Sequence, residues 1–155
     1  MGICLIDTSV FCNILQVPGR DQDRQAVLSE VRAHVEQGTT LLLPMAAIIE
    51  TGNLIARSGD GRARRRVARS FVKAVGDAIR GTAPWTPTPL FEVEALQQWL
   101  AEFPDHASQG RSFGDLSIIK EYERQCALHP WREVFIWSLD RHLASYRRAA
   151  RRPRR

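Results

Sequence analysis

The sequence predicts a three-layer α/β/α fold, in which helices flank a short central parallel sheet of about four to five strands. First, mainly apolar runs at 3–6, 40–43 and 134–137 have the length of strands that are buried on both faces. Second, the segments between these runs carry apolar residues at helical spacing. Third, 155 residues suit one domain. We expect a single domain at 1–146, followed by a basic tail at 147–155.

Proline and glycine mark the ends of the expected elements. Gly38 ends the second helix, and Pro44 fits the first turn of the third. Three prolines at 82–89 make that segment extended, at best an edge strand. In chain order, we expect a strand at 3–6, helices at 8–15 and 21–37, a strand at 40–43, helices at 44–57 and 62–80, the extended segment, a helix at 90–103, a polar loop at 104–112, a helix at 113–128, a strand at 134–137 and a helix at 141–148.

Positive charge is concentrated at the C-terminus and in the helix at 62–80. The last nine residues hold six arginines and no acid, and without them the formal net charge of +5 becomes −1. A row of arginines is suited to binding phosphate oxygens. The basic residues of the helix are explained equally well as a face that is exposed to solvent. The candidate nucleic-acid-binding residues are Arg62, Arg66, Arg69, Lys73, Arg147 and Arg148. The apolar face expected to pack on the core carries Val67, Phe71, Val72, Val75 and Ile79.

Four carboxylates are expected at the carboxyl edge of the sheet, where open parallel sheets bind their ligands. Asp7 follows the first strand and Asp140 the last, while Asp115 and Glu50 lie on largely apolar helix faces. Acids in such places are costly unless they are paired or bind a metal, and oxygen ligands favour Mg²⁺ or Mn²⁺ over Zn²⁺. Singly, the three aspartates are also explained as caps or turn residues, and Glu50 as a surface acid.

The segments that hold these acids resemble the motifs of PIN domains, a family of metal-dependent ribonucleases that includes the VapC-type toxins. They read IDTSV at 6–10, PMAAIIE at 44–50, GDLSII at 114–119 and SLDRHL at 138–143, and the resemblance covers roughly residues 2–146. It implies that the four acids bind Mg²⁺ or Mn²⁺, and that the Thr8 and Ser138 hydroxyls orient a carboxylate or a metal-bound water. In place of the family's short closing strand, the chain is expected to end in its arginine tail.

The resemblance implies an endoribonuclease that leaves a 5′-phosphate and a 3′-hydroxyl, acting as the toxin of a type II toxin–antitoxin system. Its partners would be tRNA or ribosomal RNA, a protein antitoxin and a second copy of the chain. Two alternatives stay open: a PIN nuclease of RNA processing or phage defence without an antitoxin, and a non-catalytic RNA-binding scaffold. A receiver-like phosphoacceptor fits less well, because it needs two adjacent acids where Asp7 stands alone.

The sequence carries no recognisable export or membrane signal. No apolar run approaches the roughly 18 residues of a membrane helix, and the N-terminus lacks the basic start of a signal peptide. The odd number of cysteines, three, fits a reducing compartment. We therefore expect a cytoplasmic protein that does not enter the membrane.

Overall fold

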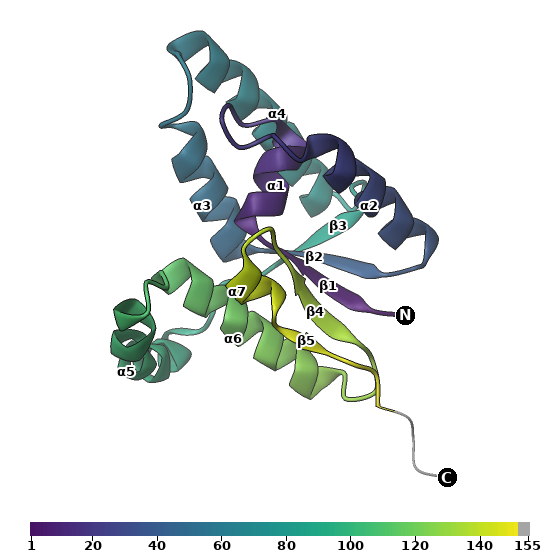
Figure 1. Cartoon of the computed structure of the whole chain (residues 1–155), viewed down its shortest axis with the longest axis vertical. Coiled ribbons are helices and arrows are strands. Elements are labelled where there is room, and N and C mark those ends of the chain that lie inside the picture. Colours follow the sequence, from purple (N-terminus) through teal and green to yellow (C-terminus); the bar gives the residue numbers. More distant parts are fainter. Residues whose placement is uncertain (152–155) are drawn as a thin grey trace.

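The computed structural model of the protein describes residues 1–151, which form a five-stranded sheet between helices (Figure 1). The strand order is β3-β2-β1-β4-β5; the first four strands are parallel, and β5 is antiparallel to β4. The expected three-layer α/β fold is confirmed. The strands are β1 (Ile3–Ile6), β2 (Thr40–Pro44), β3 (Trp85–Thr88), β4 (Val134–Trp137) and β5 (Arg147–Arg148).

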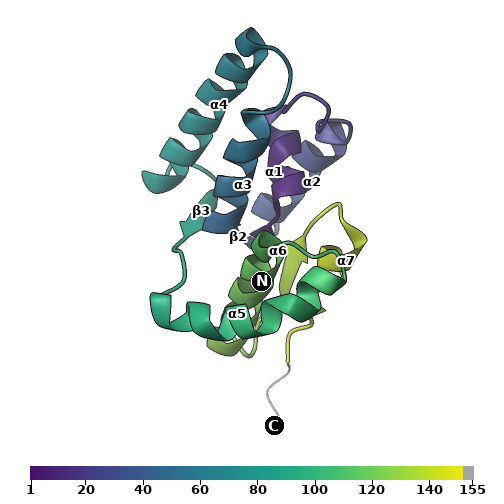
Figure 2. The same ribbon diagram turned by 90° about the vertical axis from the view of Figure 1, so that its left-hand side faces the viewer.

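Seven helices cover the sheet in the part of the chain that the structure describes. In Figure 1, α1, α2 and α4 lie on one side of the sheet, and α5 and α6 lie on the other. Helix α3 contacts α1, α4 and α6, and Figure 2 shows it between α1 and α4. The helices are α1 (Thr8–Leu15), α2 (Arg24–Glu36), α3 (Met45–Ile55), α4 (Gly61–Ile79), α5 (Val93–Ser108), α6 (Phe113–Leu128) and α7 (Arg141–Ala144).

The core is built around the two central strands, β1 and β4, whose residues are all buried. Phe11 of α1 is fully buried, and its ring packs against Phe71 of α4 and Trp85 of β3, with centroids 6.4 and 5.9 Å apart. Three elements, α1, α4 and β3, therefore share one aromatic cluster. The segment with three prolines forms β3 at the edge of the sheet, as expected for residues that cannot donate to a second neighbour.

The packed face of α4 is narrower than the sequence indicates. Val67 is buried, and Phe71 and Val75 pack against the core as expected. Val72 and Ile79, in contrast, are 68% and 72% exposed, so their assignment to the packed face is wrong. Each follows an inward residue directly, and one helical step of about 100° turns it away from the core.

Helix α5 extends beyond its expected end and includes Pro104, so the polar loop expected at 104–112 is largely helical. A proline inside a helix removes one N–H donor and crowds the carbonyl four residues earlier, at a cost of about 3 kcal/mol. Aromatic contacts with α6 offset that loss, because the rings of Phe103 and Trp99 lie 5.2 and 6.5 Å from the ring of Phe113.

The final helix ends at Ala144, and the two arginines that follow form β5 instead of a tail. Arg147 pairs with Glu133 at 2.6 Å, and its guanidinium lies 4.4 Å from the ring centre of Phe135. Arg148 donates to the backbone carbonyls of three residues at 2.6–2.8 Å, namely Cys126, His129 and Arg132. The folded domain therefore extends to Arg148, past the boundary expected at 146. The end of the expected tail, 152–155, lies outside the described residues.

Candidate active site

A cavity of about 460 Å³ opens at the carboxyl ends of β1 and β4. The chain adds β2 and β3 on one side of β1 and then crosses over to add β4 on the other, so the strand order reverses between β1 and β4. Open α/β sheets bind their ligands at such a reversal. All four predicted acids line this cavity, and they arrive from four different places in the fold: Asp7 after β1, Glu50 on α3, Asp115 on α6 and Asp140 after β4.

Asp7 is the buried acid of the cavity, with 5% of its surface exposed. Its Oδ2 accepts hydrogen bonds from the hydroxyls of Ser138, at 2.7 Å, and Ser9, at 2.9 Å. The backbone N–H of Ser9 donates to the same oxygen at 3.4 Å, which makes Asp7 the N-cap of α1. Oδ1 takes none of these three bonds. One carboxylate oxygen therefore fixes the side chain, and the other keeps its lone pairs for a further partner.

Burial raises the pKa of Asp7, because the charged carboxylate loses its solvation there. Hydrogen bonds from the hydroxyls of Ser138 and Ser9, and from the backbone amides of Thr8 and Ser9, lower the pKa of Asp7 but do not cancel the effect of burial. Within residues 1–151, no lysine or arginine forms an ion pair with Asp7. A cation in the cavity would favour its charged form.

Two serines join the ends of the two central strands. The backbone N–H of Leu139 donates to Oγ of Ser9 and that of Asp140 donates to Oγ of Ser138, both at 3.0 Å. The two hydroxyl oxygens lie 3.3 Å apart. Because both hydroxyls also bind Asp7, this network holds the turn after β4 against the start of α1 and fixes the buried carboxylate between them.

Asp140 and Asp115 are both caps and cavity residues. Oδ1 of Asp140 accepts from the backbone N–H groups of His142 and Leu143 at 2.8 and 3.2 Å. Oδ2 of Asp115 accepts from the backbone N–H of Ser112 at 3.1 Å, in a capping box at the start of α6. In the part of the chain described, the second oxygen of each aspartate accepts no hydrogen bond. The cap explanation and a ligand role are therefore compatible, as for Asp7.

Glu50 occupies the rim of the cavity. It is exposed together with Ile49, whereas Ala47, Ile48 and Thr51 point into the core. The expectation that Glu50 lies on an inward apolar face is therefore wrong, because the buried face of α3 is turned away from it. The cost of a buried charge applies to Asp7 and not to Glu50.

The polar cavity residues that were missed from the sequence include Ser9 and several residues in or beside the loop between α1 and α2. Asn13 is buried, donates to the carbonyl of Ser9 at 2.9 Å and accepts from the N–H of Asp23 at 3.0 Å. These bonds hold the loop so that Arg20 and Asp23 line the cavity. Loop residues follow no period, which is why they gave no signal. Ser9 could have been found, since a serine two residues after an aspartate often binds its carboxylate in a turn.

Thr8 lines the cavity beside Asp7. Within the described residues, however, the side-chain hydroxyls that bind Asp7 are those of Ser9 and Ser138. The expected role of Ser138 agrees with this geometry, and Ser9 binds the same carboxylate in addition. The expected role of Thr8 toward a metal-bound water stays a prediction.

The charge of the cavity is strongly unbalanced. Across residues 1–151, five acids and one arginine line it: Asp7, Asp23, Glu50, Asp115, Asp140 and Arg20. None of these six forms an ion pair within that range. Like charges around one cavity repel, so the site favours a ligand that brings positive charge.

The donor atoms suit a hard divalent cation in kind. They are carboxylate and hydroxyl oxygens, which Mg²⁺ and Mn²⁺ prefer. In the described part of the chain, no three acid, histidine or cysteine side chains are close enough to form a ready-made metal cluster. This arrangement still fits Mg²⁺, which keeps several waters and often takes only one or two carboxylates from the protein.

The predicted RNA-binding residues divide into three groups. Arg62, Arg66 and Arg69 are exposed on α4. Lys73, also exposed, is paired with Asp77 at 2.7 Å. Arg147 and Arg148 are engaged within the fold, as described above, and Arg148 has its guanidinium committed to three carbonyls. The charged group of Arg148 therefore serves the packing of β5, and an RNA contact by this residue stays a prediction.

Comparison with known proteins identified no relative: no protein-family model matches the chain, and no curated protein matches it. Within residues 1–151, none of the helices combines the length and the apolar character that crossing a membrane requires.

Proposed function

We propose that this protein is a metal-dependent endoribonuclease that hydrolyses RNA phosphodiester bonds with Mg²⁺ or Mn²⁺. The observation that carries the proposal is one cavity at the reversal of strand order, which five carboxylates and one arginine of the described residues line. Carboxylate-rich sites of this kind hold the divalent cations that assist phosphodiester hydrolysis. The four motif segments that resemble PIN domains support RNA as the substrate.

The carboxylates that would hold the metal are those of Asp7, Asp115, Asp140 and Glu50. A bound metal supplies an activated water and neutralises charge on the phosphate. Ser9 and Ser138 keep the Asp7 carboxylate in one orientation through Oδ2. Arg20, which has no ion-pair partner within residues 1–151, would donate to phosphate oxygens.

The reaction is a hydrolysis. The oxygen of water forms a bond to phosphorus, the bond from phosphorus to the 3′ oxygen breaks, and that oxygen takes up a proton. The products are a 3′-hydroxyl and a 5′-phosphate, and no oxidant or second substrate is needed.

The test is cleavage of total bacterial RNA by the purified protein in Mg²⁺ or Mn²⁺, with EDTA as the metal-free control. Asp7→Asn and Asp115→Asn should abolish a discrete product. Asp105→Asn, which removes one exposed charge from α5, should leave it unchanged. Product that persists in EDTA or in Asp7→Asn would refute the proposal. Absence of product from folded wild-type protein in metal would favour the RNA-binding scaffold.

We further propose that the nuclease is the cytoplasmic toxin of a type II pair, active on tRNA or ribosomal RNA, and that it forms a homodimer and binds a protein antitoxin. The support is the resemblance of the motif segments. Coexpression with the product of a short neighbouring gene should restore growth and yield a complex in which cleavage is inhibited. Growth arrest that no neighbouring gene relieves would favour a role in RNA processing or phage defence.

A further inference from the structure

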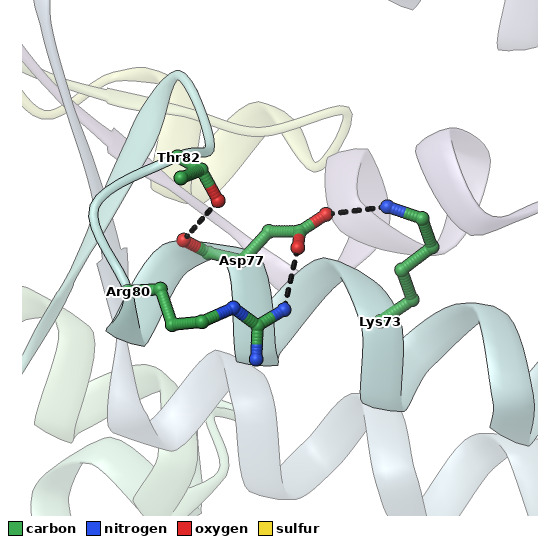
Figure 3. A network of polar contacts seen from close by, with 4 residues as sticks. All are labelled: Lys73, Asp77, Arg80 and Thr82. Atoms are coloured by element: carbon green, nitrogen blue, oxygen red, sulfur yellow. Dashed lines mark hydrogen bonds and ion pairs between the residues drawn. The ribbon is translucent and has the colours of Figure 1, made fainter.

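The exposed side of α4 has two halves that differ in charge pairing. In the C-terminal half, Asp77 binds both Lys73 and Arg80 at 2.7 Å, as Figure 3 shows. The backbone carbonyl of Asp77 also accepts from the hydroxyl of Thr82 at 3.2 Å. These two cations are therefore both paired with one carboxylate within about one turn of the helix.

The N-terminal half of α4 carries five arginines that form no ion pair within residues 1–151. One of them, Arg64, donates to the backbone carbonyl of Gly59. The other four we name the arginine stripe: Arg62, Arg65, Arg66 and Arg69. Their spacing of three and four residues places them on one face of the helix. Among residues 1–151, these four line a shallow hollow of about 420 Å³ without any other residue. None of them forms an ion pair within residues 1–151.

The acid closest in sequence does not neutralise the arginine stripe. Asp60 is the N-cap of α4, and its carboxylate accepts from the backbone N–H of Ala63 at 2.8 Å. The positive end of the helix dipole lies in the same turns. Like charges three and four residues apart on a helix repel each other. A bound anion would reduce this repulsion between the arginines.

The stripe begins close to the candidate active site along the chain. Leu54, near the end of α3, lines the cavity, and Arg62 follows eight residues later. The turn between α3 and α4 also packs on the loop that carries Arg20: a Cβ added at Gly59 would lie 3.4 Å from Cγ of Pro18. The same loop forms one wall of the cavity, so a strand leaving the cavity past this wall would meet the first turns of α4.

We propose that the arginine stripe is a second binding site for the RNA strand, and that it holds phosphates outside the bond to be cleaved. The identification of the ligand as RNA rests on the proposed function. The location of the binding site rests on the unpaired guanidinium groups. Guanidinium suits phosphate because it donates two parallel hydrogen bonds. A protein partner is disfavoured, because protein interfaces need an apolar centre and only arginines line this hollow. The site includes Arg65 and excludes Lys73.

The test measures binding of a fluorescent single-stranded RNA in EDTA, where the proposed cleavage cannot occur, over a range of salt concentrations. The variant Arg65→Gln/Arg66→Gln removes two charges from the stripe. The matched control, Lys73→Gln/Arg80→Gln, removes two charges from the paired half of the same helix. Circular dichroism verifies that both variants keep the fold.

The stripe variant should bind RNA at least tenfold more weakly at 0.15 M salt. In a plot of log affinity against log salt concentration, the slope for this variant should be less steep by about 1.4. Each lost contact with a single-strand phosphate accounts for about 0.7 of this change. The control should stay within about twofold of wild type, with an unchanged slope. Equal losses in both variants would overturn the proposal, because net charge alone would then explain binding. An unchanged slope in the stripe variant would also overturn it.

The outcomes separate this proposal from the proposed function. If the stripe variant loses RNA binding while wild-type protein cleaves nothing in metal, the stripe stands and the nuclease assignment fails. If wild type cleaves and the stripe variant binds as wild type does, the nuclease stands and the stripe fails. Stronger competition by polyglutamate than by RNA of equal charge would show that the stripe binds an acidic protein segment instead.

Discussion

Replacing Asp7 with asparagine should stabilise the metal-free protein at neutral pH while it abolishes cleavage. The reason is that Asp7 is buried, has no cationic partner within residues 1–151 and has a raised pKa. Asparagine has nearly the same shape, and its carbonyl oxygen can still accept from the hydroxyls of Ser9 and Ser138. The substitution therefore removes the buried charge and keeps the hydrogen bonds around it.

The pH dependence follows from the direction of the shift. Folding raises the pKa of Asp7, so between the ordinary aspartate value of 3.8 and the higher folded value, the folded protein binds more protons than the unfolded chain. The stability contributed by this group is fully present below the ordinary pKa and is lost as the pH rises through the folded pKa. Asp7→Asn should show no such loss.

The expected gain is about 1.4 kcal/mol for each pKa unit by which folding raises the pKa of Asp7. For a domain of this size, each kcal/mol changes Tm by about 2–4 °C. If the proposed function holds, divalent metal should reverse the order of stability, because it would bind the folded wild type and not the unfolded chain. At a metal concentration 100 times Kd, binding adds about 2.7 kcal/mol to the wild type and little to Asp7→Asn.

The assay is urea unfolding followed by circular dichroism, at several pH values between 4 and 8, in EDTA and then in Mg²⁺. Asp105→Asn is the matched control, since it removes the same charge from an exposed position. If Asp7→Asn were less stable than wild type at pH 8 in EDTA, or if the two stability profiles ran parallel over the whole pH range, the account of Asp7 as an unpaired buried charge would be refuted.

Three further predictions concern other parts of the molecule. Arg20→Gln should lower kcat/KM for RNA by about 100-fold, as expected when one donor to the reacting phosphate is lost; a change under threefold would remove Arg20 from the reaction. Phe11→Ala should lower the free energy of unfolding by about 3–5 kcal/mol in urea, and a loss below 1 kcal/mol would contradict its place in the core. Arg148→Leu should cost about 3 kcal/mol because it leaves three carbonyls without their donor, whereas Arg151→Leu should cost little; equal effects would show that β5 does not depend on this guanidinium.

Much of the fold could be predicted because its strong signals are local. The bounds of α1, α6 and β4 agree with the sequence-based prediction, since each combines a clear apolar pattern with a clear cap or break. Strand β5 could not be predicted in this way. Two arginines have no strand signal of their own, and they form β5 because β4 offers a free edge and nearby carbonyls accept from Arg148.

The candidate site was predictable where it depends on strand ends and helix starts. Asp7 and Asp140 follow strands, and parallel strands bring their carboxyl ends to one edge of the sheet. Arg20 and Asn13 were not predictable, because their positions depend on how the loop between α1 and α2 folds back. Glu50 was predicted to line the cavity from an apolar face of its helix. It lines the cavity from the exposed side of α3 instead.

The antiparallel direction of β5 has a practical consequence for handling the protein. Ile3 and Arg148 both pair with Val134, at the start of β4, so the chain enters and leaves the sheet at the edge opposite the cavity. An affinity tag or bead linker attached before Ile3 would start at the edge opposite the acids, so immobilised protein would still expose the cavity. Shortening the chain to remove its basic end should stop after Arg148, because a cut at 146 would remove a strand along with the charge.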